Sequence, residues 1–484
     1  MSVTTRPTAV REPIRESLRI AGEKIAHDRV IEIRHPYSRE LIGTVPQATL
    51  DDVRRALQIA RRYKSKLTRY DRYQILMKAG AIIATRREAI ARLITLESGL
   101  CLKDSLYEVG RASDVLLFAA NQSLVDDGSV FSCDLTAHGK SRKVYTLREP
   151  LLGAITAITP FNHPLNQVIH KIAPAIATNN RVVLKPSEKT PLTAYALADV
   201  LYEAGLPPQM LSVLSGNPAE IADELLTSAD VDLVTFTGGV AVGKYIAAKA
   251  VYKRQILELG GNDPIIVLED ADLEEAAALA AAGSYKNSGQ RCTAVKRMLV
   301  QASVADRFIE LLVEKTRVVK YGDPFDPAMD MGTVIDEASA KRFEAVVNQA
   351  VASGARLLIG NQRHGALYSP TVLDRVSPDM TVVREETFGP VSPVIRFDTV
   401  DEAIRISNGT AFGLSSSLCT NRLDLITRFI QELNVGSVNV REVPGYRLEM
   451  TPFGGIKDSG LGYKEGVLEA MKSFCNVKTY SLPW

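Results

Sequence analysis

Residues 153–160 read GAITAITP, a short run of apolar and β-branched residues that stops at a proline. Such a run is typical of a buried strand, because proline cannot continue the hydrogen-bonded ladder of a sheet. Residues 181–186 (RVVLKP) repeat the pattern, and residues 231–236 (VDLVTF) indicate a further strand. Apolar residues at helical spacing over 164–177 and 190–205 separate these strands. The alternation predicts a parallel sheet with helices on both faces.

A second alternating block lies later in the chain. It contains a predicted helix at 304–316 and predicted strands at 298–301, 356–359, 394–397 and 436–440. A chain of 484 residues is too long for a single core and should divide into two or three domains. The second block therefore predicts a second α/β domain.

Strand-like segments also lie outside both blocks, at 129–132, 141–148 and 473–480. The first two suggest a β-hairpin. An unpaired strand edge is a liability in solution, so these segments are candidates for pairing with another subunit. A short sheet within one chain is the alternative.

The composition limits the possible partners. The chain has 58 basic and 56 acidic residues and a net charge of +2, which argues against nucleic-acid or membrane partners. Its five cysteines lack the regular spacing of a disulfide framework and suit a reducing cytoplasm. Neither a signal peptide nor an apolar run of membrane-spanning length is present, and residues 1–12 are expected to form a loose arm. We therefore expect a cytoplasmic protein with a small-molecule substrate and no metal site.

One cysteine stands in unusual surroundings. Residues 287–297 (NSGQRCTAVKR) place Cys292 among small residues, with Arg291 before it and two cations soon after. Nearby positive charge lowers the pKa of a thiol and yields the reactive thiolate, although a buried, unreactive cysteine is the commoner state. Upstream, Glu258 ends a short apolar run and is followed by flexible glycines. A nucleophilic cysteine with a distant carboxylate base suits covalent catalysis at a carbonyl.

Three other segments have features of a cofactor site. Residues 236–244 (FTGGVAVGK) follow a strand and open a helix, so a phosphate could approach the helix N-terminal amides closely. Residues 185–188 (KPSE) end a strand where ribose hydroxyls bind in open α/β sheets. Residues 385–390 read EETFGP. Taken singly, a plain turn, a surface ion pair and an acidic turn would explain them.

The turn after the first strand adds a possible electrophilic group. Residues 161–164 read FNHP, and the side-chain amide of Asn162 could donate to a developing oxyanion. An asparagine before a proline is otherwise an ordinary turn residue.

Taken together and in order, these segments, with PFGGIKDSG at 452–460, resemble the aldehyde dehydrogenase superfamily over nearly the whole chain. The resemblance implies two parallel-sheet α/β domains and a small β element. The Rossmann-like NAD-binding domain would be discontinuous, at 1–127 and 151–258, and the catalytic domain would span 259–460. The oligomerisation element would combine 128–150 and 470–484 and would join subunits into a homodimer or homotetramer.

The resemblance also implies roles for single residues. Cys292 would be the nucleophile, Glu258 the base that activates water, and Asn162 the oxyanion donor together with the backbone N–H of Cys292. The cofactor would be NAD, since the Glu188 carboxylate should repel the 2′-phosphate of NADP. The residues expected to contact it are Thr159, Pro160, Phe161, Lys185, Ser187, Glu188, Gly216, Phe236, Thr237, Gly238, Gly239, Gly243, Leu259, Glu386 and Phe388.

Substrate contacts are expected from Arg111, His163, Arg291, Thr293 and Arg447. Arginine suits carboxylate, phosphate or phosphonate groups, and several converging cations would be costly without an anion between them. We therefore expect a small anionic aldehyde, phosphonoacetaldehyde foremost, that is oxidised to the free acid through a thiohemiacetal and a thioester. Glyceraldehyde 3-phosphate, a carboxylated semialdehyde or lactaldehyde is the alternative substrate. A catalytically silent binding or structural protein on the same fold is the alternative of another class.

Overall fold

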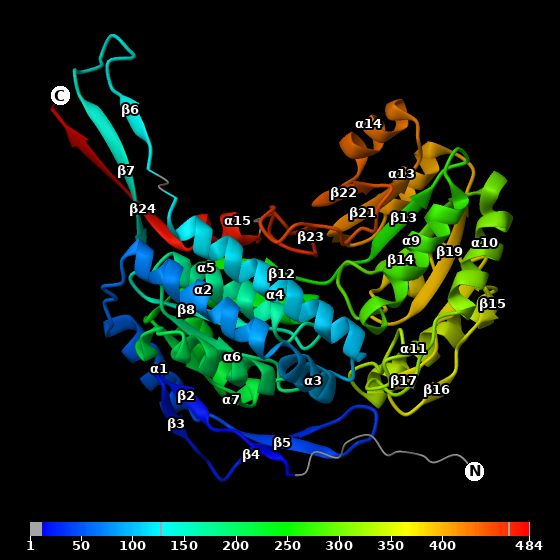
Figure 1. Cartoon of the computed structure of the whole chain (residues 1–484). Helices are drawn as coiled ribbons and strands as arrows, with labels where there is room; N and C mark the ends of the chain where they lie inside the picture. The colour runs from blue at the N-terminus through cyan, green and yellow to red at the C-terminus, as the bar shows by residue number, and fades with distance from the viewer. Residues whose placement is uncertain (1–11, 126–127, 463–464, 484) are drawn as a thin grey trace.

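A computed structural model describes residues 12–125, 128–462 and 465–483 (Figure 1). The N-terminal arm expected at 1–12 lies outside these residues except for its last position. None of the described helices is long and apolar enough to cross a membrane.

The first sheet has seven strands in the order β12-β11-β8-β9-β10-β2-β3. The five strands from β12 to β10 are mutually parallel, as the sequence predicted. The N-terminal strands β2 and β3 extend one edge in antiparallel pairing, which was not predicted. The strands are β2 (Leu18–Ile20), β3 (Glu23–Ile25), β8 (Ala154–Ile158), β9 (Val182–Lys185), β10 (Leu211–Val213), β11 (Val231–Thr237) and β12 (Arg254–Glu258).

Helices cover both faces of this sheet, and alternate residues of each strand point to opposite sides. Val182 and Leu184 of β9 pack with helices α2 to α6, whereas Val183 packs with α1, α7 and α8. The helices are α1 (Leu50–Arg62), α2 (Arg69–Thr85), α3 (Arg87–Ser98), α4 (Leu102–Ser123), α5 (Asn166–Ala177), α6 (Leu192–Glu203), α7 (Pro218–Thr227) and α8 (Val240–Ala250).

The second sheet also has seven strands, in the order β15-β18-β19-β14-β13-β21-β22, and only β15 runs antiparallel to its neighbour. Helices α9 and α10 cover one face, and α11, α13 and α14 cover the other. The strands are β13 (Asp263–Val267), β14 (Val295–Gln301), β15 (Arg356–Ile359), β18 (Thr371–Asp374), β19 (Val391–Phe397), β21 (Ser415–Cys419) and β22 (Ser437–Val440). The helices are α9 (Leu273–Tyr285), α10 (Ala302–Arg317), α11 (Glu337–Ala352), α13 (Val400–Asn408) and α14 (Leu423–Glu432).

The chain passes from the first sheet to the second between Glu258, which ends β12, and Asp263, which begins β13. The proposed domain division at 258–259 falls in this link. Glu258 therefore lies at the junction of the two sheets.

A third sheet of three strands, ordered β24-β7-β6, extends away from the body (Figure 1). The predicted hairpin is confirmed, and the C-terminal strand pairs with it antiparallel from Cys475↔Pro150 to Leu482↔Lys143. Part of the proposed 470–484 segment is helical, because α15 ends only at Ser473. The elements are β6 (Val130–Ser132), β7 (Lys143–Pro150), α15 (Val467–Ser473) and β24 (Cys475–Leu482).

Short elements complete the fold. A three-stranded sheet is ordered β1-β5-β4, and two small antiparallel pairs join β16 with β17 and β20 with β23. Their bounds are β1 (Ile14–Arg15), β4 (Val30–Arg34), β5 (Leu41–Pro46), β16 (Arg363–His364), β17 (Leu367–Tyr368), β20 (Phe412–Gly413) and β23 (Ile456–Lys457), with helices η1 (Pro208–Met210), η2 (Lys286–Gly289) and α12 (Thr381–Arg384).

Buried carboxylates of α3 and α4 anchor the helices of the first domain. Glu97 accepts hydrogen bonds from the backbone N–H groups of Leu192 and Thr193, at 2.7 and 3.1 Å, where α6 begins. Glu108 does the same for Leu165 and Asn166, at 2.8 and 2.9 Å, where α5 begins. A helix N-terminus favours an acceptor of this kind. Glu108 thereby fixes the turn that carries Asn162.

Candidate active site

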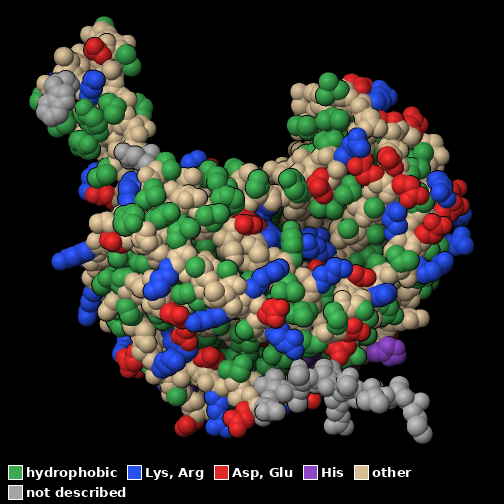
Figure 2. Space-filling model, viewed as in Figure 1, with side chains coloured by type: hydrophobic (Ala, Val, Ile, Leu, Met, Phe, Trp, Pro, Cys, Tyr) green, Lys and Arg blue, Asp and Glu red, His purple; other side chains and the backbone are tan. Residues whose placement is uncertain are grey.

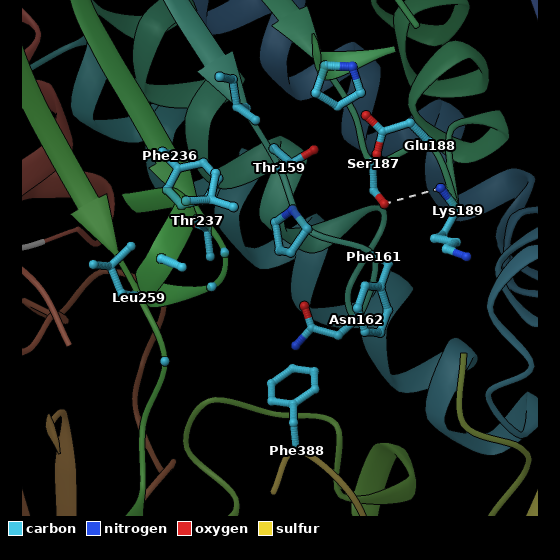
Figure 3. A pocket seen from close by; sticks show the side chains of 18 of the residues that line it. Thr159, Phe161, Asn162, Ser187, Glu188, Lys189, Phe236, Thr237, Leu259 and Phe388 are labelled. Carbon is cyan, nitrogen blue, oxygen red and sulfur yellow. Dashed lines mark hydrogen bonds between the residues drawn. The ribbon is translucent and has the colours of Figure 1, made fainter. Parts of the chain in front are cut away.

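A cavity of about 1030 Å³ opens at the carboxyl ends of the first sheet's strands (Figure 3). Its lining reaches Cys292. Parallel β8, β9 and β11 deliver Thr159, Lys185 and Thr237 to this edge, where open α/β sheets bind ligands. The sequence-predicted residues that line it are Cys292, Asn162, Thr159, Pro160, Phe161, Lys185, Ser187, Glu188, Phe236, Thr237, Gly238, Gly239, Leu259, Glu386 and Phe388.

Two predicted cofactor residues are not among the lining residues. Gly243 lies beneath the surface, where an added Cβ would overlap Leu259. At Gly216 a Cβ would come within 2.8 Å of Ile221. Both glycines therefore permit close packing under the cavity wall.

The turn before α8 fits a phosphate group. Gly239 is the N-cap of α8 and supplies no side-chain capping bond, and the space beside it is open. The buried hydroxyls of Thr159 and Thr237 have no hydrogen-bond partner among the described residues. Buried polar atoms are normally paired, so this edge has the features expected where a polar ligand binds. Together with the cavity's size, these groups fit a dinucleotide.

The far end of the cavity carries an ion pair between Lys185 and Glu188. Ser187 lies beside them and accepts a hydrogen bond from the backbone N–H of Lys189 at 3.2 Å (Figure 3). These side chains end β9 and offer both a cation and a carboxylate to a ligand.

The Glu-Thr-Phe-Gly-Pro turn closes the other end, next to Cys292. Glu386 accepts a hydrogen bond from the N–H of Gly261 at 3.0 Å. The rings of Phe388 and Phe161 meet edge to face at 5.9 Å (Figure 3). Phe388 holds a left-handed backbone, with φ of 54°.

The loop before the nucleophile has a strained backbone. Asn287, Ser288 and Gly289 are all left-handed, with φ of 56°, 54° and 71°. Non-glycine residues rarely adopt this conformation unless their surroundings fix it. Asp104 of α4 accepts from the N–H of Asn287 at 2.8 Å, and Ser288 donates to the carbonyl of Gly332 at 3.2 Å.

Gly289 fits because its neighbour leaves no space for a side chain. An added Cβ would overlap the carbonyl of Gly389, so the nucleophile loop packs directly on the 385–390 turn. The Lys296 ammonium also binds the Gly289 carbonyl.

The Glu258 segment lies directly against the nucleophile. A Cβ on Gly261 would overlap the carbonyl oxygen of Cys292, and a Cβ on Gly260 would overlap Glu386. Glu258 is 3% exposed, and its charge acts on Cys292. The two sequence segments that first suggested covalent catalysis are thus in contact.

The protonation state of Cys292 differs from the expectation. Burial, together with the negative charges of Asp263 and Glu386, raises the pKa of its thiol to about 12. Arg447 lowers this pKa but is outweighed. The expected low pKa is therefore wrong for this arrangement, because desolvation dominates. The thiol must give its proton to a neighbouring base when it reacts.

Asn162 points toward the same loop. Its side-chain amide is buried and donates one hydrogen bond to the carbonyl of Gln290 at 2.8 Å. A primary amide carries a second N–H, which can serve an oxyanion.

His163 and the three arginines gather beside Cys292 and not in the cofactor cavity. The charges of Arg111, Arg291 and Arg447 all act on His163, and with burial they lower its pKa well below the usual value. We call these three arginines the cation cluster. The charge of each of them acts on the same histidine.

The tautomer of His163 follows from its neighbours. The side-chain nitrogen of Asn287 donates to the carbonyl of Asn162 at 3.3 Å and lies 2.8 Å from Nε2 of His163. Nε2 must then accept, so the proton of the neutral ring is on Nδ1. Nδ1 of His163 and Nε of Arg291 are buried without a partner among the described residues.

A buried carboxylate that the sequence did not reveal holds two members of the cation cluster. Glu449 pairs with Arg111, lies 2.6 Å from Nε2 of His170 and 3.8 Å from Arg447. Although burial opposes ionisation, His170, Arg447 and Arg111 hold the pKa of Glu449 below its usual range. The Arg447 guanidinium also stacks over Phe453 at 3.8 Å.

The remaining predicted contact residue packs on the same segment. Thr293 is 8% exposed, and a Cβ on Gly445 would overlap its hydroxyl. Gly445 thus allows the segment carrying Arg447 to approach the nucleophile loop.

Helix α4 contributes more to the site than the predicted Arg111. Asp104, Tyr107 and Glu108 precede Arg111 at helical spacing, so one face of α4 points toward the nucleophile loop and the start of α5. This spacing was readable in the sequence once Arg111 had been chosen.

Comparison with known proteins agrees with this geometry. The model of the aldehyde dehydrogenase family matches residues 24–480. The 3-sulfolactaldehyde dehydrogenase of Priestia aryabhattai is 38% identical over 460 residues, covering 95% of this chain and 96% of that protein.

Solved structures of the same family superpose closely. An NAD-dependent aldehyde dehydrogenase from Sinorhizobium meliloti has a TM-score of 0.92 at 34% identity and covers 98% of this chain and 95% of its own. The glyceraldehyde-3-phosphate dehydrogenase GapN of Methanocaldococcus jannaschii, complexed with NADP, has a TM-score of 0.90 at 36% identity and covers 95% and 100%. The chain belongs to the aldehyde dehydrogenase family. It is an NAD(P)-dependent aldehyde dehydrogenase.

The contact between Gly261 and Cys292 yields a prediction. In Gly261→Ala, the new Cβ must displace the Cys292 backbone, so kcat should fall by at least about tenfold, since small misplacements of a nucleophile are costly. NAD binding, measured by fluorescence titration, should change little. The control is Gly80→Ala, whose Cβ would meet nothing within 4 Å. Full activity in Gly261→Ala would refute the tight contact.

Proposed function

We propose that this enzyme oxidises a small anionic aldehyde to the free carboxylic acid with NAD, and that its substrate is phosphonoacetaldehyde, which becomes phosphonoacetate. The observation that carries the proposal is the cation cluster beside Cys292. Only Glu449 forms an ion pair with Arg111 and Arg447 among the described residues, and Arg291 keeps a buried, unpaired Nε. A buried surplus of positive charge is costly unless a ligand neutralises it.

The proposed reaction begins when Cys292 gives its proton to Glu258 and its sulfur adds to the aldehyde carbon. The second N–H of Asn162 and the backbone N–H of Cys292 stabilise the resulting oxyanion. When bound, the nicotinamide accepts the hydride, which leaves a thioester on Cys292. Glu258 releases the proton of Cys292 to solvent and then takes a proton from water, and the resulting hydroxide attacks the thioester carbon. The C–S bond breaks, the carboxylic acid leaves, and the proton on Glu258 passes to the sulfur to reform the thiol.

The alternative substrates share the same requirement. The relative from Priestia is named for an aldehyde with a sulfonate tail, and GapN is named for one with a phosphate. Glyceraldehyde 3-phosphate, sulfonated aldehydes, carboxylated semialdehydes and lactaldehyde therefore form the comparison set. Phosphonoacetaldehyde is favoured because several cations lie close to the nucleophile, which suits an aldehyde with a short anionic tail. The complete constellation of Cys292, Glu258 and Asn162 argues against a silent binding protein on this fold.

For the cofactor we propose NAD over NADP. Glu188 places a carboxylate at the end of β9, where the adenosine ribose of a dinucleotide would lie. A 2′-phosphate there would meet negative charge, although Lys185 partly balances it.

We also propose that the β24-β7-β6 sheet joins subunits into a homodimer or homotetramer. Hydrophobic side chains gather on the extended sheet (Figure 2). Phe131 and Val477 are 55% and 58% exposed, which is unusual for apolar residues in strands.

The five cysteines are all free, a state that suits the cytoplasm.

Glu258→Gln tests the release of a free acid. Without a base for water, the thioester should accumulate after one hydride transfer, so NADH should appear as a burst followed by slow turnover. Stopped-flow absorbance with phosphonoacetaldehyde measures this trace. Cys292→Ala is the control and should give no burst at all. Steady turnover at the wild-type rate would remove Glu258 from this role.

Arg447→Ala tests the anionic substrate. Loss of a charge-assisted contact costs on the order of 1.5–3 kcal/mol, which is roughly tenfold to a hundredfold or more in kcat/KM for phosphonoacetaldehyde. Propanal, which lacks a charged tail, should lose much less. Arg441→Ala, at an exposed position that pairs with Glu275, is the matched control. Equal losses for both aldehydes would leave Arg447 as a structural residue.

Glu188→Gln tests the cofactor preference. Removal of the carboxylate should raise the kcat/KM ratio of NADP to NAD about tenfold, because Lys185 would then be free to meet the 2′-phosphate. The matched control is Glu203→Gln on α6, whose carboxylate pairs with Arg86. An unchanged ratio would show that Glu188 does not discriminate between the two nucleotides.

A further inference from the structure

Lys286 brings a fourth cation to the group beside Cys292. It begins the short η2 turn that leads into the nucleophile loop. Its ammonium lies 3.2 Å from the ring centre of Tyr107, a close cation–π contact. Tyr107 and Arg111 are one turn apart on α4, so the ring lies on the α4 face that also carries Arg111.

Lys286 lies within electrostatic range of the residues expected to contact the substrate. Its charge acts on His163, and the charges of Arg111 and Arg291 act on Lys286. Lys286 makes no ion pair with any residue in the described part of the chain, in contrast to Arg111. It therefore faces the cation cluster without a direct ion pair, and Asp104 is the carboxylate whose charge acts on it.

Few carboxylates near this group can balance it. Asp104 accepts from the N–H of Asn287, and Glu449 pairs with Arg111. Glu465, near Arg447, is matched by Lys171 at 2.6 Å. Glu108 of α4 is a third, since its charge acts on Arg111. Three carboxylates thus face Lys286 and the three arginines, so the group keeps a positive surplus only while Lys286 is charged.

We propose that Lys286 is a specificity-determining residue that supplies the charge by which the enzyme favours a dianionic aldehyde tail, such as a phosphonate, over a monoanionic one, such as a sulfonate. The inference rests on the proposed function and goes beyond it, since three arginines alone would accept either tail.

The charge of Lys286 is adjustable near neutral pH. Burial and the charges of Arg291 and Arg111 lower its pKa to about 8, whereas Asp104 and Cys101 act to raise it. Tyr107 faces it from α4, and His163, already neutral, faces it from the turn after β8. A lysine with a lowered pKa is charged below that value and neutral above it. Preference for the dianion should therefore fall as pH rises through about 8.

The test compares phosphonoacetaldehyde with sulfoacetaldehyde, which have the same carbon skeleton and differ by one charge. In the ratio of kcat/KM for phosphonoacetaldehyde to kcat/KM for sulfoacetaldehyde, effects on the nucleophile, on hydride transfer and on folding cancel. The scan runs from about pH 7.5 to 10, above the second ionisation of a phosphoryl group at about 6. Wild type, Lys286→Met, Lys286→Arg and Lys103→Met are measured. Lys103 is an exposed lysine of α4 that pairs with Asp330 at 2.7 Å, and it is the matched control.

In Lys286→Met the phosphonate-to-sulfonate ratio should fall about tenfold at pH 7.5 and lose its pH dependence, because a charge-assisted contact is lost. Lys286→Arg should keep a high ratio at every pH, since arginine stays charged. Lys103→Met should behave like wild type. A ratio that is unchanged in Lys286→Met, or that follows the same pH curve in Lys286→Arg as in wild type, would overturn the inference.

The proposed function fails in a different way. If wild type oxidises propanal as efficiently as both anionic aldehydes, the cation cluster does not select anions at all. If wild type prefers the anions but Lys286→Met reduces both equally, only the role of Lys286 is lost.

Discussion

The left-handed backbone at Asn287, Ser288 and Gly289 is the constraint on which the site depends. Two of these residues carry side chains in a conformation that costs roughly 1–2 kcal/mol each for L-residues. Asp104, Gly332 and Lys296 hold the turn, and the 385–390 turn packs on Gly289. Strain of this kind persists only where surrounding contacts fix it.

This single turn couples three parts of the chemistry. Its exit presents Cys292 to Gly261 and the Glu258 segment. The Gln290 carbonyl accepts a hydrogen bond from the side-chain amide of Asn162, and the side chain of Asn287 fixes the tautomer of His163. Helix α4 reinforces the coupling, because Asp104 holds the turn while Glu108 holds the start of α5 next to Asn162 and His163. Nucleophile, oxyanion donor and substrate contact therefore have a common support.

The sequence predicted those parts of the fold that depend on local patterns. Apolar runs ending in proline marked β8 and β9, and glycines followed by a helix marked the phosphate turn before α8. Contacts between distant segments could not be read in this way. Arg111 and Glu449 are 338 residues apart, and nothing in either segment indicates that they pair. The N-terminal edge strands β2 and β3 are too short for a periodic signal.

The error on Cys292 has the same origin. Positive neighbours in the sequence suggested a lowered pKa, but the folded chain buries the thiol and places Asp263 and Glu386 near it. Arg291 directs one nitrogen of its guanidinium to the carbonyl of Gly283, at 2.9 Å, and the cation that lowers the pKa of Cys292 is Arg447. Adjacency in sequence fixes which residues share a loop. Burial and the direction of each side chain decide which charge acts.

The two sides of Cys292 are therefore built on different principles. On the cofactor side, backbone amides, glycines and unpaired hydroxyls form a surface that suits a dinucleotide, with the Lys185–Glu188 ion pair at its far end. On the other side, charged side chains from α4, the nucleophile loop and the segment before β23 meet around a neutral histidine. Exchange of one arginine of the cation cluster would alter the electrostatic balance there, whereas exchange of Asp104 would also release the strained turn. Substrate choice can thus vary through the arginines of the cation cluster, because the hydrogen bonds from the turn to Asp104, Gly332 and Lys296 do not involve those arginines.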